Sequence, residues 1–197
     1  MNLPNKLTIF RIILVPIIVL IYIFPYAQFG IYPGYVNVSY VALPVKNIIV
    51  LILFAVASFT DFLDGYIARK YNMVTTFGKF MDPIADKLLV NTLFILLAVD
   101  GIIPVVPVLV MIWRDSIVDA VRMMASGKGR VMSAGMLGKL KTLLQMMTII
   151  FVLLCNLPFE LYQLPFSTLL LWSATFISVA GGISYFLQAK DIIMESK

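Results

Sequence analysis

The sequence predicts an all-α, polytopic membrane protein with six transmembrane helices. Of its 197 residues, 61% are hydrophobic and only 13% are charged, which is about half the charged share of an ordinary globular protein. The apolar residues fall into six runs, each near the roughly 20 residues that a helix needs to cross hydrocarbon. Lysine and arginine concentrate on one side of these runs. Residues 1–197 are therefore expected to form a single integral membrane domain.

The six runs can be placed in order along the chain. They span residues 7–26, 45–70, 78–100, 104–125, 136–156 and 166–189. The first contains Pro16, where a kink is expected. It also carries Arg11 and lacks a small-residue cleavage site, so we expect a membrane helix and not a cleavable signal. A polar stretch with Gly and Pro, residues 29–44, is expected to be an outer loop.

The distribution of basic residues predicts the orientation. With the N-terminus inside, the outer loops receive only Lys46. The inner side receives Lys6, Arg11, Arg69, Lys70, Lys79, Lys128, Arg130, Lys139, Lys141, Lys190 and Lys197. Because cytoplasmic loops carry an excess of lysine and arginine, both termini are expected in the cytoplasm, in a multi-pass protein of the cell membrane.

Composition also excludes several classes of site. The chain has no histidine, which removes the usual acid–base side chain and histidine metal ligands. Its single cysteine, Cys155, rules out an intramolecular disulfide. The net charge of +5 suits anionic lipid on one side, and the basic residues are too scattered to indicate nucleic-acid binding.

Four aspartates interrupt the apolar sequence: Asp61, Asp64, Asp82 and Asp86. The first pair is spaced i, i+3 and the second i, i+4, so each pair lies on one helix face. Asp61 lies about 24 Å along its helix from residue 45, while Asp82 and Asp86 lie about 6 and 12 Å from the inner end of theirs. All four carboxylates are therefore expected in one shallow layer on the cytoplasmic side of the second and third helices.

Such a layer suits divalent cations and a phosphorylated ligand. Four carboxylates in an apolar setting need a positive partner to stay ionised, and Mg²⁺ or Mn²⁺ can clamp a diphosphate for displacement at phosphorus. One carboxylate could accept the proton of an attacking hydroxyl. A cation transporter could also use these aspartates, but it would leave the small residues Gly65, Ala68 and Gly78 without a purpose.

The residues of this stretch resemble a known family. The pattern Asp61-x2-Asp64-Gly65-x2-Ala68-Arg69-x8-Gly78-x3-Asp82-x3-Asp86 fixes eight residues over 26 positions and is similar to the complete signature of the CDP-alcohol phosphotransferases. The resemblance implies that the four aspartates hold two divalent cations, that Asp86 also serves as the base, and that the enzyme is a homodimer. It implies CDP contacts at Asp61, Gly65, Ala68, Arg69 and Gly78.

The stretches NLPNKLTIFRIILVP and GKLKT resemble, within this family, bacterial phosphatidylglycerophosphate synthases. These enzymes transfer the phosphatidyl group of CDP-diacylglycerol to sn-glycerol 3-phosphate in phospholipid biosynthesis and release CMP. Another acceptor remains an alternative: phosphatidylglycerol, giving cardiolipin, or serine or inositol phosphate. Those relatives usually carry Arg-Glu where this chain has Arg114-Asp115, which leaves the role of Asp115 open, along with that of Asp119.

Glycerol 3-phosphate is a small dianion, so its pocket needs cations near the metal site. The candidates are Arg114, Arg122, Lys139 and Lys141, with Lys87 possible and Ser133 as a hydroxyl contact. Lys139 and Lys141 could instead form a basic edge for anionic headgroups, and Arg114 could be satisfied by a neighbouring aspartate.

Polar residues recur every third position where the first helix meets the cytoplasm: Asn5, Thr8 and Arg11. Asn5 and Thr8 are candidate nucleotide contacts, with capping and interface anchoring as the alternative.

Overall fold

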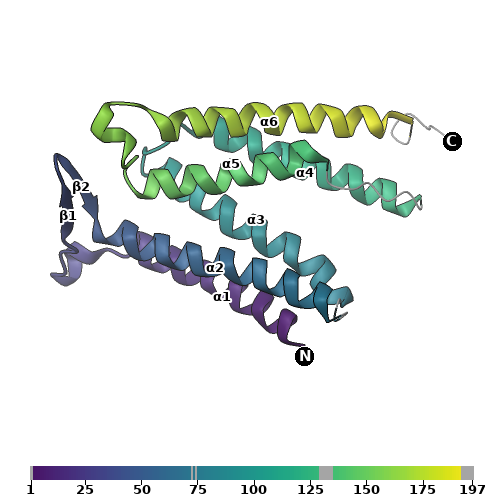
Figure 1. Cartoon of the computed structure of the whole chain (residues 1–197), viewed down its shortest axis with the longest axis horizontal. Helices are drawn as coiled ribbons and strands as arrows, with labels where there is room; N and C mark the ends of the chain where they lie inside the picture. The colour runs from purple at the N-terminus through teal and green to yellow at the C-terminus, as the bar shows by residue number, and fades with distance from the viewer. Residues whose placement is uncertain (1, 72, 74, 129–134, 192–197) are drawn as a thin grey trace.

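The computed structural model is mostly helical and describes residues 2–71, 73, 75–128 and 135–191. Within these residues the long helices are α1 (Leu3–Ile23), α2 (Val45–Lys70), α3 (Thr76–Val99), α4 (Val105–Gly127), α5 (Met136–Leu153) and α6 (Phe166–Gln188). They run back and forth through the molecule, so that the start of α1 and the end of α6 lie at the same end (Figure 1).

Four of these helices, α1, α2, α5 and α6, are long and apolar enough to cross a membrane by length and composition. Helices α3 and α4 have similar lengths but carry the charged residues of the predicted site, from Asp82 to Lys87 on α3 and from Arg114 to Arg122 on α4. The all-α membrane class is thus observed, while six crossings stay a prediction.

The helix boundaries follow local signals in the sequence. Pro44, Pro104 and Pro165 directly precede α2, α4 and α6, in keeping with proline's tolerance at helix starts. Helix α1 starts at Leu3, four residues earlier than expected, and continues through Pro16 as one helix.

A β-hairpin occupies part of the stretch expected to be a loop. Strands β1 (Tyr35–Val38) and β2 (Val41–Pro44) pair antiparallel, with Val38 opposite Val41. Val41 and Leu43 of β2 are buried and lie on one face, as the period-2 alternation of a strand requires. All four residues of β1 are exposed. The Tyr40 hydroxyl donates to the backbone carbonyl of Glu160, which ties the hairpin to the 3₁₀ turn η2 (Phe159–Tyr162). A second turn, η1 (Tyr26–Phe29), follows α1.

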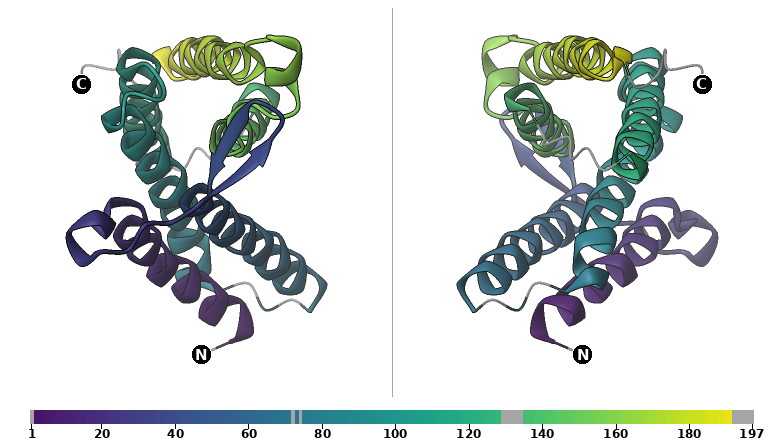
Figure 2. Two further views of the ribbon diagram at one scale, coloured as in Figure 1. Left: turned by 90° about the vertical axis from the view of Figure 1, so that its left-hand side faces the viewer. Right: turned by 90° about the vertical axis from the view of Figure 1, so that its right-hand side faces the viewer.

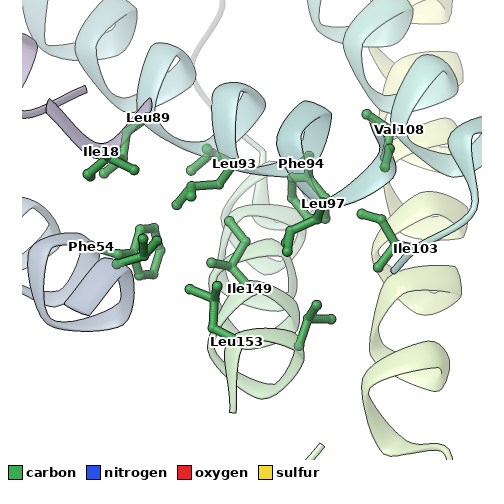
Figure 3. Packing of buried hydrophobic residues seen from close by; sticks show 14 of the residues in the cluster. Ile18, Phe54, Leu89, Leu93, Phe94, Leu97, Ile103, Val108, Ile149 and Leu153 are labelled. Atoms are coloured by element: carbon green, nitrogen blue, oxygen red, sulfur yellow. The ribbon is translucent and has the colours of Figure 1, made fainter. Parts of the chain in front are cut away.

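Helix α3 crosses between the α1–α2 pair and the group of α4, α5 and α6 (Figures 1 and 2). Its buried residues Leu89, Leu93 and Leu97 face Ile18 and Phe54 on one side and α5 on the other (Figure 3). Each of these three leucines is at most 1% exposed, so the packing fixes how α3 presents its first three turns. That placement sets the position of Asp82 and Asp86 relative to α1 and α2.

Candidate active site

Two carboxylates of α2 are paired with one buried arginine of α1. Arg11 Nη1 donates to Asp61 Oδ1 at 2.5 Å, and Arg11 Nη2 donates to Asp64 Oδ2. The side chains of Arg11 and Asp64 are 1% and 3% exposed, whereas that of Asp61 is 41% exposed. Because the aspartates are three residues apart on one helix, a single guanidinium can reach both. Arg11 is their counter-charge in this structure.

The same face of α1 contacts the start of α3. Thr8 Oγ1 donates to Asp82 Oδ1 at 2.7 Å, and Thr75 Oγ1 donates to Asn5 Oδ1 at 2.7 Å. Thr75 also caps α3 by accepting from the Gly78 backbone N–H at 3.0 Å. A Cβ at Gly78 would lie 3.5 Å from both Asn5 Oδ1 and Asp82 Oδ2. The structure thus brings together four residues predicted for the site, Asn5, Thr8, Gly78 and Asp82.

The four aspartates lie close enough to influence one another electrostatically. Asp61 and Asp82 repel Asp64, and Asp61 repels Asp86. Carboxylate oxygens are the ligands that Mg²⁺ and Mn²⁺ prefer, so the donor chemistry fits the expected cations. In the described part of the chain no three acidic side chains have the geometry of a metal cluster.

Arg69 lies over Gly65 in the last turns of α2. A Cβ at Gly65 would lie 3.4 Å from Arg69 Nη2, an ordinary van der Waals contact. The surface that the glycine leaves open is therefore covered by another predicted nucleotide contact. Ala68, on the same helix, is half-buried.

A second cluster forms where α3, α4, α5 and α6 meet around a cavity of about 120 Å³. Its charged lining residues are Lys87, Arg114, Asp115, Asp119, Arg122 and Lys141. The four cations against two carboxylates leave a formal charge of +2 on the lining.

Ion pairs organise this lining and give both aspartates of α4 a place. Lys141 Nζ donates to both carboxylate oxygens of Asp115 at 2.6 Å, and Arg114 Nη1 donates to Asp115 Oδ1 at 3.1 Å. Lys87 pairs with Asp119. Asp115 and Asp119 therefore act as counter-ions that hold cations around the cavity.

Two guanidinium nitrogens of the lining are buried without a partner. Among the described residues, neither Arg114 Nη2 nor Arg122 Nε makes a hydrogen bond. Burying such donors unsatisfied costs about 1–3 kcal/mol or more each, and an anion in the cavity would relieve that cost.

The two clusters adjoin each other through Asp86. Lys87 and Lys141 of the cavity lie within electrostatic range of its carboxylate, as Arg11 and Asp61 do. Of the other predicted acceptor residues, Lys139 is exposed and does not line the cavity, and Ser133 lies outside the described residues.

A larger cavity of about 390 Å³ lies elsewhere, under the hairpin. Its lining includes Asn47, Asn156 and Glu160 and none of the residues predicted for the site. The larger cavity therefore does not coincide with the predicted site residues, whereas the smaller cavity beside Asp86 is lined by several of them.

Residues 1–180 match the family model described as CDP-alcohol phosphatidyltransferase. The chain belongs to the CDP-alcohol phosphatidyltransferase family. The match includes all four aspartates and all six charged residues that line the second cavity, whereas Tyr185 of that lining lies beyond it.

The chain is similar over nearly its whole length to bacterial members of the family. It is 45% identical over 185 residues to a protein of Bacillus subtilis (strain 168), covering 94% of this chain and 93% of that protein. It is 36% identical over 190 residues to a protein of Rickettsia bellii (strain RML369-C), covering 96% of each. Both relatives are named CDP-diacylglycerol–glycerol-3-phosphate 3-phosphatidyltransferase.

Several residues of the two clusters were not predicted from the sequence to belong to the site. Arg11 was not predicted as a site residue, although an arginine within an apolar run is itself a signal of function. Tyr185 of α6 lines the second cavity, and two neighbouring glycines, Gly181 and Gly182, contact Arg114. No local pattern marks these three, because their role depends on how α6 packs against α4.

Proposed function

We propose that this chain transfers the phosphatidyl group of CDP-diacylglycerol to sn-glycerol 3-phosphate, giving phosphatidylglycerophosphate and CMP. The observation that carries the proposal is the cationic cavity beside Asp86. Counted over the described residues, its lining has a formal charge of +2 and two guanidinium nitrogens without a hydrogen-bond partner. A phosphomonoester carries a charge of about −1.5 to −2 near neutral pH, which matches that lining. The names of the relatives support the same acceptor.

The lining favours an acceptor with a doubly charged phosphate over serine, because the serine zwitterion has no net charge to match the +2 of the described lining residues. Arg114 and Arg122 bind the phosphate through charge-assisted hydrogen bonds, and Lys141 adds charge while Asp115 holds it in position. Lys87, the residue after Asp86, lines the cavity and lies within electrostatic range of the Asp86 carboxylate. The acceptor is thereby oriented with its primary hydroxyl toward the aspartates.

Asp86 then accepts the proton of that hydroxyl. The hydroxyl oxygen forms a bond to the phosphatidyl phosphorus of the donor, the bond from that phosphorus to the oxygen of CMP breaks, and CMP leaves. Histidine is absent from the chain, so a carboxylate is the available base. Asn5, Thr8, Gly65, Ala68, Arg69 and Gly78 hold the cytidine nucleotide.

Asp61, Asp64, Asp82 and Asp86 would hold the two divalent cations, Mg²⁺ or Mn²⁺. When bound, such cations neutralise the diphosphate and stabilise the charge that develops on the leaving oxygen. In this structure Arg11 supplies the positive charge opposite Asp61 and Asp64, a role that the bound cations would share or take over.

The membrane setting completes the proposal. All six α-helices cross the bilayer, both termini and the site face the cytoplasm, and two copies form a homodimer. Support comes from the basic residues at the end where α1 starts, against Lys46 at the other. The acyl chains of the donor stay in the bilayer while its headgroup reaches the aspartate layer.

The test is purified protein in detergent with CDP-diacylglycerol, glycerol 3-phosphate and Mg²⁺, with CMP release as the measurement. We expect Mg²⁺-dependent release, stopped by EDTA, and a loss of at least about a hundredfold in Asp86→Asn. Lys6→Gln, an exposed change near the same end, is the control.

Three results would contradict the proposal. These are full activity of Asp86→Asn, CMP release only with phosphatidylglycerol as acceptor, and ion flux in liposomes without any nucleotide.

A further inference from the structure

One face of α6 is fitted to the side chain of Arg114. A Cβ at Gly181 would lie 2.9 Å from Arg114 Nη2, and a Cβ at Gly182 would lie 2.9 Å from Arg114 Cγ. Real Cβ atoms do not approach that closely, so both positions need glycine for the arginine to stay where it is. Glycine inside a helix costs about 1 kcal/mol relative to alanine, and two in succession indicate a requirement for close contact.

The backbone of the same face binds the arginine directly. Arg114 Nε donates to the Ser178 carbonyl oxygen at 2.9 Å, and Nη1 donates to Asp115 at 3.1 Å. These contacts fix two edges of the planar guanidinium and leave Nη2 as the nitrogen without a partner among the described residues. Because the guanidinium is planar, hydrogen bonds from Nε and Nη1 fix the position of Nη2 as well.

Tyr185 extends this face to the second arginine. Its ring lies 4.9 Å from Arg122 Cζ and 5.7 Å from Arg114 Cζ, within cation–π range of both. Its hydroxyl oxygen accepts from Arg122 Nη2 at 2.5 Å and from the Gly135 backbone N–H at 3.0 Å. One aromatic side chain, 4% exposed, therefore sets the distance between two cations of the cavity.

The four positions share one helix face. Ser178, Gly181, Gly182 and Tyr185 follow the spacing i, i+3, i+4, i+7, which forms a single stripe on a helix. We define this stripe as the arginine seat. The arginines themselves belong to α4, so the seat acts across the α4–α6 interface.

We propose that the arginine seat of α6 positions Arg114 and Arg122 for the phosphate of the acceptor, and so selects phosphomonoester acceptors. The inference rests on the proposed function, since it assigns the cavity to that substrate. Ser178, Gly181, Gly182 and Tyr185 are positioning residues, because they act through the two arginines. If these residues served only to pack α4 against α6, a tight contact between the two helices would be enough. Packing alone gives no reason for two buried arginines that each keep a nitrogen without a hydrogen-bond partner among the described residues.

Gly181→Ala is the sharpest test. The added methyl group meets the far end of the Arg114 side chain, so the guanidinium shifts while the fold is kept, and alanine adds helix propensity. We expect the KM for glycerol 3-phosphate to rise about tenfold or more, as for a lost hydrogen bond to a charged group. The KM for CDP-diacylglycerol should stay within about twofold, and the thermal midpoint should not fall.

Two further variants and a control complete the experiment. Tyr185→Phe keeps the ring over both arginines and removes the hydroxyl, so we expect a smaller rise in the same KM, and Tyr185→Leu a larger one. Gly127→Ala is the matched control, because a Cβ at this helical glycine would meet no atom of the described residues within 4 Å. Its kinetics should equal those of the wild type.

The outcomes distinguish a failure of the arginine-seat proposal from a failure of the proposed function. If the wild type releases no CMP with glycerol 3-phosphate, the proposed function fails. If the wild type is active, the seat is overturned by unchanged kinetics in Gly181→Ala and Tyr185→Leu. It is equally overturned by an equal rise of both KM values, or by losses that only follow a lower thermal midpoint.

Discussion

Three charged side chains in the interior of this protein are each paired with an opposite charge. Arg11, Asp64 and Lys141 are each less than a tenth exposed, and each has an opposite charge within hydrogen-bond distance. Removing one partner of such a buried pair leaves an uncompensated charge, which costs about 3–5 kcal/mol in proteins. The chemistry of the candidate site therefore shares its residues with the stability of the fold.

Replacing Arg11 by methionine tests that overlap. We expect Arg11→Met to lower the thermal midpoint in detergent with EDTA by several degrees, corresponding to about 3 kcal/mol. Asp64 accounts for most of the loss, because Asp61 is 41% exposed and water solvates it. Added Mg²⁺ should restore part of the midpoint by supplying the missing positive charge.

The control is Lys6→Met, an exposed residue on the same helix, which should leave the midpoint near that of the wild type. An Arg11→Met midpoint equal to the wild type in EDTA would show that the ion pairs contribute nothing to stability.

At the scale of elements, α3 both fills the core and carries half of the aspartates. Leu93 is fully buried in the described structure, whereas Ile95, two residues on, is 46% exposed. Leu93→Ala should leave a cavity and lower the free energy of unfolding by about 2–5 kcal/mol. The KM values for CDP-diacylglycerol and for glycerol 3-phosphate should change little, because the substitution removes no side chain of the candidate site. Thermal unfolding and initial rates measure the two effects.

Ile95→Ala is the paired control and should shift the midpoint far less. A comparable shift in both variants would mean that Leu93 is not part of a packed core.

The sequence predicted the helices within a few residues because apolar runs must satisfy their backbone hydrogen bonds internally in lipid. It did not predict the hairpin at residues 35–44, whose burial on one face depends on packing near η2. Asp61 and Asp64 could be paired from local spacing alone. Their partner Arg11, fifty residues earlier, could not, and neither could Tyr185, because tertiary packing alone brings these residues to the site.

For the whole molecule, the arrangement of the helices leads to a testable prediction of which end faces the cytoplasm. The hairpin and the start of α1 lie at opposite ends (Figure 1), and the proposed orientation puts the hairpin outside. We predict that, in a Cys155→Ser background, Tyr32→Cys reacts with a membrane-impermeant maleimide in intact cells. Ser126→Cys should react only after permeabilisation. Both positions are exposed.

The unsubstituted Cys155→Ser protein controls for background labelling. The reverse pattern, with Ser126→Cys labelled in intact cells, would place the aspartate layer on the outer face and contradict the cytoplasmic assignment.

The pairing of Arg11 with two carboxylates of α2 also bears on how the chain enters the bilayer. A ribosome releases α1 before α2, so the cation arrives first and the aspartates meet it as the second helix inserts. An aspartate entering hydrocarbon alone costs about 2.5–3.5 kcal/mol, and a partner on the preceding helix reduces that barrier. The α1–α2 pair, closed by the hairpin, can therefore assemble as an insertion unit before the cations of the active site are acquired.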